Sequence, residues 1–387
     1  MLIGYDDRNT GRAGGTGVAT YARALEMAAR LTGLDVARIS DGESTVVRHK
    51  GFRAYVRRHG RAIRSSRVVD VHEDNLFVCD DLYRTAHVRY GLTRCMTAIS
   101  GNMAPSIMHW TYPLPIYWRN VRNVVTIHDI IPVIKPEMSG ISAKRLRSLL
   151  LACVSRADAV VTVSDVVRQD ILANLPISPE KVVNLGQPIC LEDHEVAESA
   201  YSPSVAPEGG FLYFGTVERR KNVGRIIAAH AASGTMRPLT IIGNDGWEAD
   251  NEWAALRLHP NPELVRRVAW CSRPSLLRAI REARAVVFPS LAEGFGLPIV
   301  EAMALGTPVI TSRGHATEEI ASAGAFLIDP CDVQEIARAI ASLDRSDDIR
   351  AAYVQRGLAR ASDFSMHHFA QRLHAFYTQL PVRSLPL

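Results

Sequence analysis

The sequence alternates strand-like and helix-like segments in two separate runs, and this alternation restricts the fold more than any other feature. Short stretches rich in β-branched residues are followed by helical patterns, first over residues 1–195 and again from about 209 onward. Between them lies a segment rich in Ala, Ser, Pro and Gly, which is typical of a linker. The expected strands are residues 2–5, 124–127, 159–163, 211–214, 239–242, 285–288 and 308–311. This order predicts an α/β chain with two parallel sheets wrapped by helices.

We expect two Rossmann-like domains, because a chain of 387 residues exceeds what one hydrophobic core usually serves. The first is expected at 1–195 and the second at 209–363, followed by an amphipathic helix at 364–387. The expected inward positions of that helix are Phe364, His368, Leu373 and Phe376. Ligands of open α/β sheets bind beyond the carboxyl ends of the strands, so we expect the active site in a central cleft that the two domains face.

Composition and charge exclude several other classes of protein. Charged residues make up 22% of the chain and hydrophobic ones 47%, which is ordinary for a soluble globular protein. No apolar run reaches the roughly 18 residues of a membrane-spanning helix, and Asp6, Asp7 and Arg8 interrupt any signal peptide, so we expect a cytoplasmic protein. The six cysteines form no CxxC pair and predict no zinc site. A net charge of +5 is too small to indicate a nucleic-acid partner.

The most informative motif follows the expected strand 285–288. A turn containing Gly294 and Gly296 leads into a helix that Pro298 can open and Gly306 can close. Backbone amides at the start of a helix attract anions, and glycines let a ligand approach closely. The turn therefore predicts a diphosphate site.

Two carboxylates, Glu293 and Glu301, flank this turn. A carboxylate beside a phosphate site is better suited to accept hydrogen bonds from sugar hydroxyls than to bind phosphate. In the simpler alternative, Glu301 only favours the helix N-terminus and Glu293 is solvated.

A second motif, residues 214–222, places three consecutive cations after the first strand of the second domain. Lys221 is the first candidate for neutralising a leaving diphosphate, and either Arg219 or Arg220 is the second. The alternative is a solvated basic turn.

A third motif is His128 and Asp129, directly after the expected strand 124–127. His128 could donate a hydrogen bond to a sugar hydroxyl, and Asp129 could orient an acceptor or merely cap the next segment.

A glycine-rich turn at 11–18 could also approach a donor phosphate through Gly15 and Gly17, although it lacks the GxGxxG spacing of a dinucleotide site.

These motifs together resemble the retaining GT-B glycosyltransferases of family four, which include bacterial mannosyl- and glucosyltransferases. The resemblance covers nearly the whole chain and is most specific at the paired glutamates, which stand eight residues apart as 301 − 293, and at the basic loop. It implies the GT-B fold, with the last helix crossing back to the N-terminal domain. In one departure, Thr216 stands where many relatives carry an arginine.

The resemblance also implies a role for each matching residue. Glu293 and His128 would contact the donor sugar, Lys221 the diphosphate and Glu301 the ribose. The remaining donor contacts would come from Thr216, Arg219, Arg220, Cys271, Ser272, Gly294, Phe295, Gly296 and Leu297. Residues near 271–273 would lie against the nucleobase. The family's reaction is a front-face substitution that retains the anomeric configuration, with the leaving diphosphate taking the acceptor's proton. It implies no metal and no cofactor besides the nucleotide-sugar donor.

The segment around Tyr112, residues 111–115, together with 125–132, is most similar to transferases that build bacterial polysaccharides or lipopolysaccharides from GDP-mannose or related GDP-sugars. Tyr112 and Asp129 are then expected on the acceptor side. A UDP-sugar donor remains an alternative, as do an epimerase, a phosphorylase and a nucleotide-sugar-binding subunit without activity of its own.

Residues 44–69 contain no Asp or Glu and eight Arg or Lys residues. If 52–63 is helical, an apolar stripe is flanked by arginines, as in helices that lie on anionic lipid. This pattern predicts a lipid-linked glycan acceptor and a peripheral position, through 48–67, on the inner face of the plasma membrane. A solvated basic face is the alternative.

Overall fold

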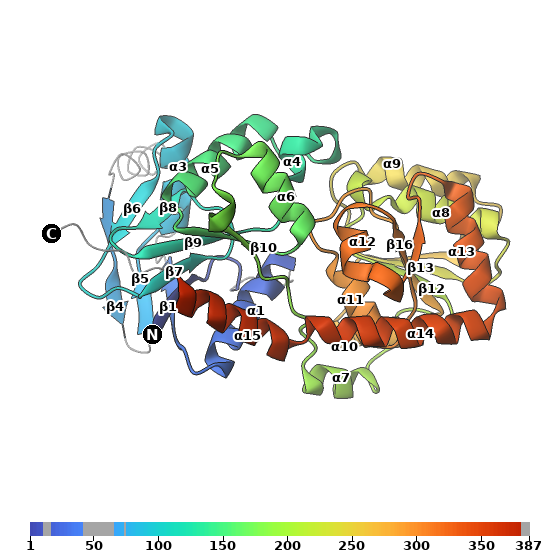
Figure 1. The fold of residues 1–387 in the computed structure, drawn as a ribbon. Coiled ribbons are helices and arrows are strands. Elements are labelled where there is room, and N and C mark those ends of the chain that lie inside the picture. Colours follow the sequence, from blue (N-terminus) through green and yellow to red (C-terminus); the bar gives the residue numbers. More distant parts are fainter. Residues whose placement is uncertain (11–16, 42–65, 73–74, 381–387) are drawn as a thin grey trace. The chain divides into compact units, whose positions relative to one another are not determined.

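The computed structural model describes residues 1–10, 17–41, 66–72 and 75–380. The chain divides into two compact units (Figure 1). The first unit comprises residues 1–133, 142–188 and 366–387, and the second comprises 134–141 and 189–365. Each unit is described by itself below.

The first unit is built on a sheet whose described strands run in the order β11-β10-β9-β7-β1-β2-β5-β4. All neighbouring strands are parallel except β4 and β5. The strands are β1 (Leu2–Asp6), β2 (Asp35–Ser40), β4 (Asp70–His72), β5 (Leu76–Val78), β7 (Ile107–Trp110), β9 (Arg122–Ile127), β10 (Ala159–Thr162) and β11 (Val182–Asn184). A smaller parallel sheet has the order β3-β6-β8, from β3 (Ser66–Val68), β6 (Thr97–Ser100) and β8 (Ile116–Trp118).

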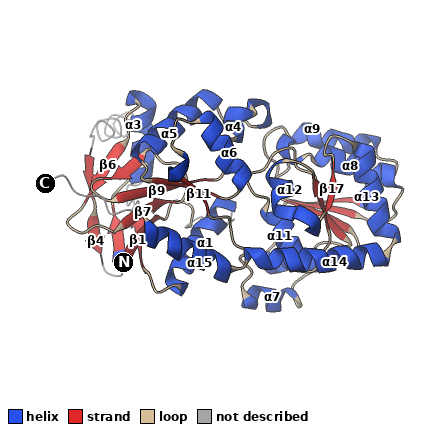
Figure 2. Cartoon of the chain, viewed as in Figure 1, coloured by secondary structure: helices blue, strands red, loops and turns tan. Residues whose placement is uncertain are grey.

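Helices cover the sheet of the first unit (Figure 2). They are α1 (Gly17–Leu31), α3 (Leu82–Thr93), α5 (Ala143–Arg156), α6 (Asp165–Asn174) and α15 (Met366–Gln379), with the short α4 (Ile131–Ile134) at the passage to the second unit. Serine hydroxyls cap the N-termini of α5 and α6. Ser142 accepts a hydrogen bond from the amide of Arg145, and Ser164 accepts one from the amide of Val167.

The second unit contains one parallel sheet whose described strands run in the order β14-β13-β12-β15-β16-β17. They are β12 (Phe211–Phe214), β13 (Leu239–Ile242), β14 (Val265–Val268), β15 (Ala285–Phe288), β16 (Val309–Ser312) and β17 (Phe326–Ile328). The helices are α7 (Asp193–Ser199), α8 (Val223–Ser233), α9 (Ala249–Trp253), α10 (Arg273–Glu282), α11 (Leu297–Ala304), α12 (His315–Ala321), α13 (Val333–Arg345) and α14 (Asp347–Ala361).

Short 3-10 turns connect several of these elements. In the two units they span Pro136–Met138, Pro179–Lys181, Arg219–Lys221, Ala254–Leu258, Pro262–Leu264, Ser322–Gly324 and Ser362–Phe364.

The α/β class and the two parallel sheets expected from the sequence are confirmed. The bounds of β12, β13 and β15 are those expected, whereas β16 begins one residue later than expected, at Val309. Pro308 has no amide hydrogen, but its carbonyl still accepts a hydrogen bond from the amide of Val286. Within the described residues, no helix is both long and apolar enough to span a bilayer.

The last helix, α15, returns to the first unit as expected, where it packs against α1. Its buried residues are Phe369, Ala370, Leu373, Phe376 and Tyr377. The expectation that His368 faces inward is wrong, because His368 is exposed and Phe369 takes the buried position.

A buried chain of hydrogen bonds fixes α15 to the sheet of the first unit. The hydroxyl of Tyr377 lies 3.0 Å from that of Tyr5 and 2.6 Å from Nδ1 of His109. Nε2 of His109 then lies 2.8 Å from the hydroxyl of Thr126, which is 3.2 Å from the hydroxyl of Tyr21. The last helix is thus part of the core of the first unit.

Candidate functional site

Glu293 lies at the centre of a cluster of charged side chains in the second unit. Its Oε2 accepts a hydrogen bond from Nη1 of Arg220 at 2.7 Å, and its Oε1 accepts one from Nζ of Lys221 at 2.5 Å. Arg220 also donates through Nη2 to Glu218 at 2.7 Å. The side chain of Glu293 is only 8% exposed. The alternative in which this carboxylate is merely solvated is therefore wrong.

Two cations hold Glu293 in its charged form. Burial by itself would raise the pKa of Glu293, but the charges of Arg220 and Lys221 outweigh burial and lower that pKa to about 2. Burial also lowers the pKa of Lys221, which Glu293 opposes. An ionised carboxylate with so low a pKa cannot serve as a general acid near neutral pH, but it can accept hydrogen bonds from hydroxyls.

Backbone contacts bring the basic loop and the glutamate loop together. Residues 219–221 form a 3-10 turn that ends at Asn222, which adopts a left-handed conformation with φ of 65°. The amide nitrogen of its side chain donates to the carbonyl of Pro289 at 2.9 Å and to that of Pro330 at 2.7 Å. In addition, the amide of Leu291 donates to the carbonyl of Arg220 at 2.8 Å. The cations are thus placed by loops that lie at the ends of neighbouring strands β12 and β15.

The structure separates the two arginines that the sequence left as alternatives. Arg220 joins the cluster around Glu293, whereas Arg219 is exposed and pairs with Glu248 at 3.4 Å. Thr216 is also exposed, and its carbonyl accepts a hydrogen bond from the hydroxyl of Tyr213 at 2.8 Å. The second cation of the cluster is therefore Arg220.

The helix after the glutamate loop, α11, begins at Leu297, one residue before the expected Pro298. Gly296 precedes it with φ of 101°, a conformation that favours glycine, and no side chain caps this end. At the other end Gly306 has φ of 75°, and its amide donates to the carbonyl of Met303 at 3.1 Å, as expected for a glycine that ends a helix. The side chain of Phe295 packs edge-on against Phe364 and is buried.

Glu301 lies on the first turns of α11, and its carboxylate is held by an arginine. Oε1 of Glu301 accepts a hydrogen bond from Nη2 of Arg273 at 2.6 Å, and the side chain of Glu301 is 8% exposed. Arg273 also donates to the carbonyl of Cys190 at 3.3 Å and lies 3.8 Å from Glu195. The alternative in which Glu301 acts only on the helix N-terminus does not account for this ion pair.

Arg273 belongs to the segment 271–273 that the resemblance places against the nucleobase, but its ion pair with Glu301 was not predicted. It is the first residue of α10, where Ser272 caps the helix by accepting a hydrogen bond from the amide of Ser275 at 3.3 Å. The helix dipole disfavours a cation at a helix N-terminus, so an arginine at this position needs a compensating negative charge. The position of Arg273 in the sequence could therefore have indicated a nearby carboxylate. Cys271, the neighbouring candidate, is half-buried.

In the first unit, His128 follows β9 directly. Its Nε2 donates to the carbonyl of Thr111 at 2.9 Å, since a carbonyl can only accept, and its ring meets that of Tyr21 edge-on at 4.8 Å. Burial lowers the pKa of His128, which favours the neutral ring. In that form Nδ1 is an acceptor, so the ring is arranged to accept a hydrogen bond from a hydroxyl, the reverse of the donor role expected from the sequence.

The other candidates of the first unit have local contacts. Oδ1 of Asp129 accepts a hydrogen bond from the amide of Ile131 at 3.1 Å, so Asp129 does cap the next segment. The ring of Tyr112 lies under the guanidinium of Arg8, and Gly17 is the first residue of α1. Gly15 and nearly all of the basic segment 48–67 lie outside the described residues.

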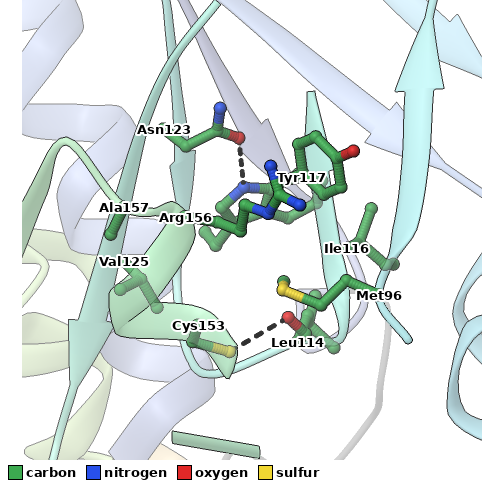
Figure 3. A pocket seen from close by; sticks show the side chains of 10 residues that line it. Met96, Leu114, Ile116, Tyr117, Asn123, Val125, Cys153, Arg156 and Ala157 are labelled. Atoms are coloured by element: carbon green, nitrogen blue, oxygen red, sulfur yellow. Dashed lines mark hydrogen bonds between the residues drawn. The ribbon is translucent and has the colours of Figure 1, made fainter. Parts of the chain in front are cut away.

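A small pocket opens in the first unit near β8, β9 and α5 (Figure 3). It is lined mainly by apolar side chains, and two of its polar side chains are bonded within the protein: Sγ of Cys153 donates to the carbonyl of Leu114 at 3.2 Å, and Asn123 accepts from Trp110 at 3.0 Å. None of the candidate site residues lines it.

Two family models match the chain. The model described as glycosyl transferases group 1 matches residues 203–360, and the model described as glycosyltransferase family 4 matches residues 14–189.

Curated relatives also match. O-antigen chain mannosyltransferase B of Escherichia coli is 31% identical over 255 residues, which are 63% of this chain and 67% of that protein. O-antigen chain mannosyltransferase RfbU of Salmonella typhimurium is 30% identical over 244 residues, 62% of this chain and 64% of that protein. The serotype-specific mannosyltransferase WbdA of Escherichia coli is 27% identical over 277 residues, but the match spans only 33% of its length.

Solved structures share the fold at low sequence identity. Sucrose-phosphate synthase from Thermosynechococcus elongatus has a TM-score of 0.68 and 17% identity, with 98% of each chain covered. HepE of Anabaena, in complex with UDP-glucose, has a TM-score of 0.66 and 16% identity, covering 98% of this chain and 99% of that chain.

Proposed function

The chain belongs to glycosyltransferase family 4, and from that membership we propose that it transfers mannose or a related hexose from a GDP-sugar to a glycan acceptor. The acceptor would be a growing polysaccharide or lipopolysaccharide chain. The observation that carries the proposal is the match to O-antigen chain mannosyltransferase B, at 31% identity over two thirds of that relative. The match to O-antigen mannosyltransferase RfbU supports the same substrate class.

The charged cluster supports a role in donor chemistry. As the glycosidic bond to the diphosphate breaks, negative charge develops on the leaving oxygen, and Arg220 and Lys221 are the cations proposed to stabilise it. In the structure both are paired with Glu293, so a bound diphosphate would share or replace these contacts. Glu293 would then accept hydrogen bonds from the hydroxyls of the donor sugar.

Three further donor roles remain part of the proposal. Glu301 would accept from the ribose hydroxyls while Arg273 holds one of its oxygens. The backbone of residues 294–297 would meet the diphosphate at the start of α11, where no side-chain cap competes. His128 would accept a hydrogen bond from a hydroxyl of the donor sugar through Nδ1.

We propose a retaining, front-face substitution in which the leaving diphosphate oxygen takes the acceptor's proton. The acceptor oxygen forms a bond to the anomeric carbon as the bond to the diphosphate breaks, and the nucleoside diphosphate leaves with that proton. The low pKa of Glu293 supports this mechanism because it leaves no proton on the carboxylate to donate near neutral pH.

The experiment that tests the donor has two stages. A thermal-shift series with GDP, UDP and ADP should show the largest shift for GDP, because a ligand that binds only the native state stabilises it in proportion to affinity and concentration. Purified enzyme should then release GDP from GDP-mannose when a mannan-type acceptor is present. A larger shift with UDP, together with release from UDP-glucose only, would replace the GDP-sugar by a UDP-sugar donor.

We also propose that the acceptor is lipid-linked and that residues 48–67 bind the enzyme to the inner face of the plasma membrane. The support for this is the composition of that segment, which lacks acidic residues. A flotation assay with vesicles containing about one third anionic lipid checks it, and the absence of binding at physiological salt would refute it.

A further inference from the structure

An arginine that forms no ion pair with any described residue lies two residues beyond the end of strand β1 in the first unit. Nη1 of Arg8 donates to Nε2 of His87 at 2.5 Å, and its guanidinium carbon lies 5.3 Å from the centre of the ring of Tyr112. Among the described residues, no Asp or Glu lies within ion-pair distance of Arg8, which is half-buried, although the charge of Arg8 acts on the buried carboxyl group of Asp6. A partly desolvated cation of this kind is costly unless an anion joins it.

A second cation acts on the same histidine. Arg145, on α5, is exposed, and in the described part of the chain its guanidinium has no carboxylate within ion-pair distance. Helix α5 is held against α3, which carries His87, by the hydroxyl of Tyr90, 2.6 Å from the carbonyl of Ser148. Burial, then Arg8 and Arg145, lower the pKa of His87 to about 4. His87 is therefore neutral and cannot add to the positive charge unless an anion arrives.

This cluster lies at the ligand-binding edge of the sheet. Strand β7 lies between β1 and β9, so Arg8, Tyr112 and His128 follow three adjacent parallel strands. Tyr112 is the next residue after Thr111, whose carbonyl accepts the hydrogen bond from His128. Whatever binds at Arg8 is therefore close to the proposed sugar contact within the same unit.

The geometry points to a binding site for an oxyanion, formed by Arg8, Arg145 and His87, that takes a phosphate or carboxylate group carried by the acceptor. Guanidinium groups match such oxyanions through paired N–H donors, and the ring of Tyr112 lies against the guanidinium of Arg8. The assignment to the acceptor rests on the proposed function, since the donor's diphosphate is assigned to Arg220 and Lys221. The alternative source of the oxyanion, the donor, is an outcome of the test.

The first test uses inorganic phosphate and the whole protein labelled with ¹³C-histidine. Phosphate should move the His87 NMR signal saturably and raise the pKa of His87 toward its ordinary value near 6.5. The double variant Arg8→Gln, Arg145→Gln should lose this response, and the matched control Arg147→Gln, on the same helix, should keep it. A His87 signal that stays fixed up to about 50 mM phosphate, a concentration at which even millimolar affinity would saturate, overturns the site.

The second test assigns the source. With an acceptor glycan that carries a phosphate and the same glycan without it, Arg8→Gln should reduce the preference for the phosphorylated form about ten-fold or more, and Arg147→Gln should not. A rise in KM for the donor, with that preference unchanged, would overturn the assignment to the acceptor. If the protein transferred no sugar at all, the proposed function would fail, while the phosphate response of His87 would still decide whether the site exists.

Discussion

Arg273 donates to the buried carboxylate of Glu301 across 2.6 Å, joining the first residue of α10 to the helix that follows the glutamate loop. Both residues belong to the second unit, and they are too far apart in the sequence for a local pattern to pair them. The pair fixes the orientation of the carboxylate that we propose for the ribose of the donor. Stability and donor binding should therefore respond together when it is broken.

Replacing Arg273 by alanine should lower the free energy of unfolding by about 2–4 kcal/mol, because the buried Glu301 carboxylate would lose its counter-charge. Urea denaturation at pH 7 measures the change. The double variant Arg273→Ala, Glu301→Gln should recover part of the loss, since no unpaired charge remains. A single variant as stable as the wild type would show that the ion pair contributes nothing.

Replacing Lys221 or Arg220 by alanine should lower kcat/KM for sugar transfer about 100-fold or more, which is typical for the loss of one group that stabilises developing negative charge. Arg219→Ala is the matched control, because Arg219 is exposed and pairs with Glu248 outside the cluster. Initial-rate kinetics with the preferred donor measure the effect, and circular dichroism checks the fold. An equal loss for all three variants would contradict the assignment of the cluster.

The low pKa of Glu293 predicts how stability changes in acid. A carboxylate whose pKa is near 2 when folded and about 4.3 when unfolded contributes stability above about pH 4.3 and loses it as the pH falls toward 2. The full contribution is about 3 kcal/mol. The difference in unfolding free energy between wild type and Glu293→Gln should therefore shrink across this range. A difference that is independent of pH would mean that the pKa is not depressed.

The contribution of Asp6 to stability should change with pH in the direction opposite to that of Glu293. It is buried at the end of β1, where it accepts hydrogen bonds from the amide and hydroxyl of Thr111, and burial outweighs these contacts and raises its pKa to about 7. Its stabilising contribution is present below about pH 3.9 and is lost as the pH rises through 7. Asp6→Asn should remove this dependence, so its stability relative to wild type should improve between pH 4 and 8. Parallel stability curves would disprove the raised pKa.

Transfer should not require a metal, because Arg220 and Lys221 supply the positive charge that a divalent cation supplies in other transferases. Initial rates measured after treatment with EDTA and after adding back Mg²⁺ or Mn²⁺ should agree within about two-fold, the reproducibility expected of such rates. A loss of activity that only the metal restores would require a different mechanism.

The parts of the site that the sequence predicted are those within a single strand-turn-helix segment. The turn between β15 and α11 could be located because glycines, a proline and two glutamates follow a buried strand, and their spacing is local. The choice between Arg219 and Arg220 could not be made, since it depends on how the 3-10 turn at 219–221 directs each side chain. The ion pair of Arg273 with Glu301 was not predicted because the two residues are 28 apart in the sequence, as 301 − 273.

The error at His368 has a similar cause. The helical pattern after Asp363 is clear, but a shift of one residue changes the buried position from His368 to Phe369. The hydrogen-bond role expected for His128 differs from the structure for another reason. Its Nε2 already donates to the carbonyl of Thr111, which leaves Nδ1 as an acceptor. Patterns give the position of a residue along an element, but not which of its atoms the tertiary structure has already engaged.

The hydrogen-bonded chain from Tyr5 through Tyr377 and His109 has a consequence for biosynthesis. Tyr5 and Tyr377 are 372 residues apart in the sequence, yet each hydroxyl is buried against the other. The first unit of the nascent polypeptide therefore cannot reach its native core until α15 has been synthesised. A premature stop codon anywhere before α15 should yield a product that chaperones retain and proteases degrade.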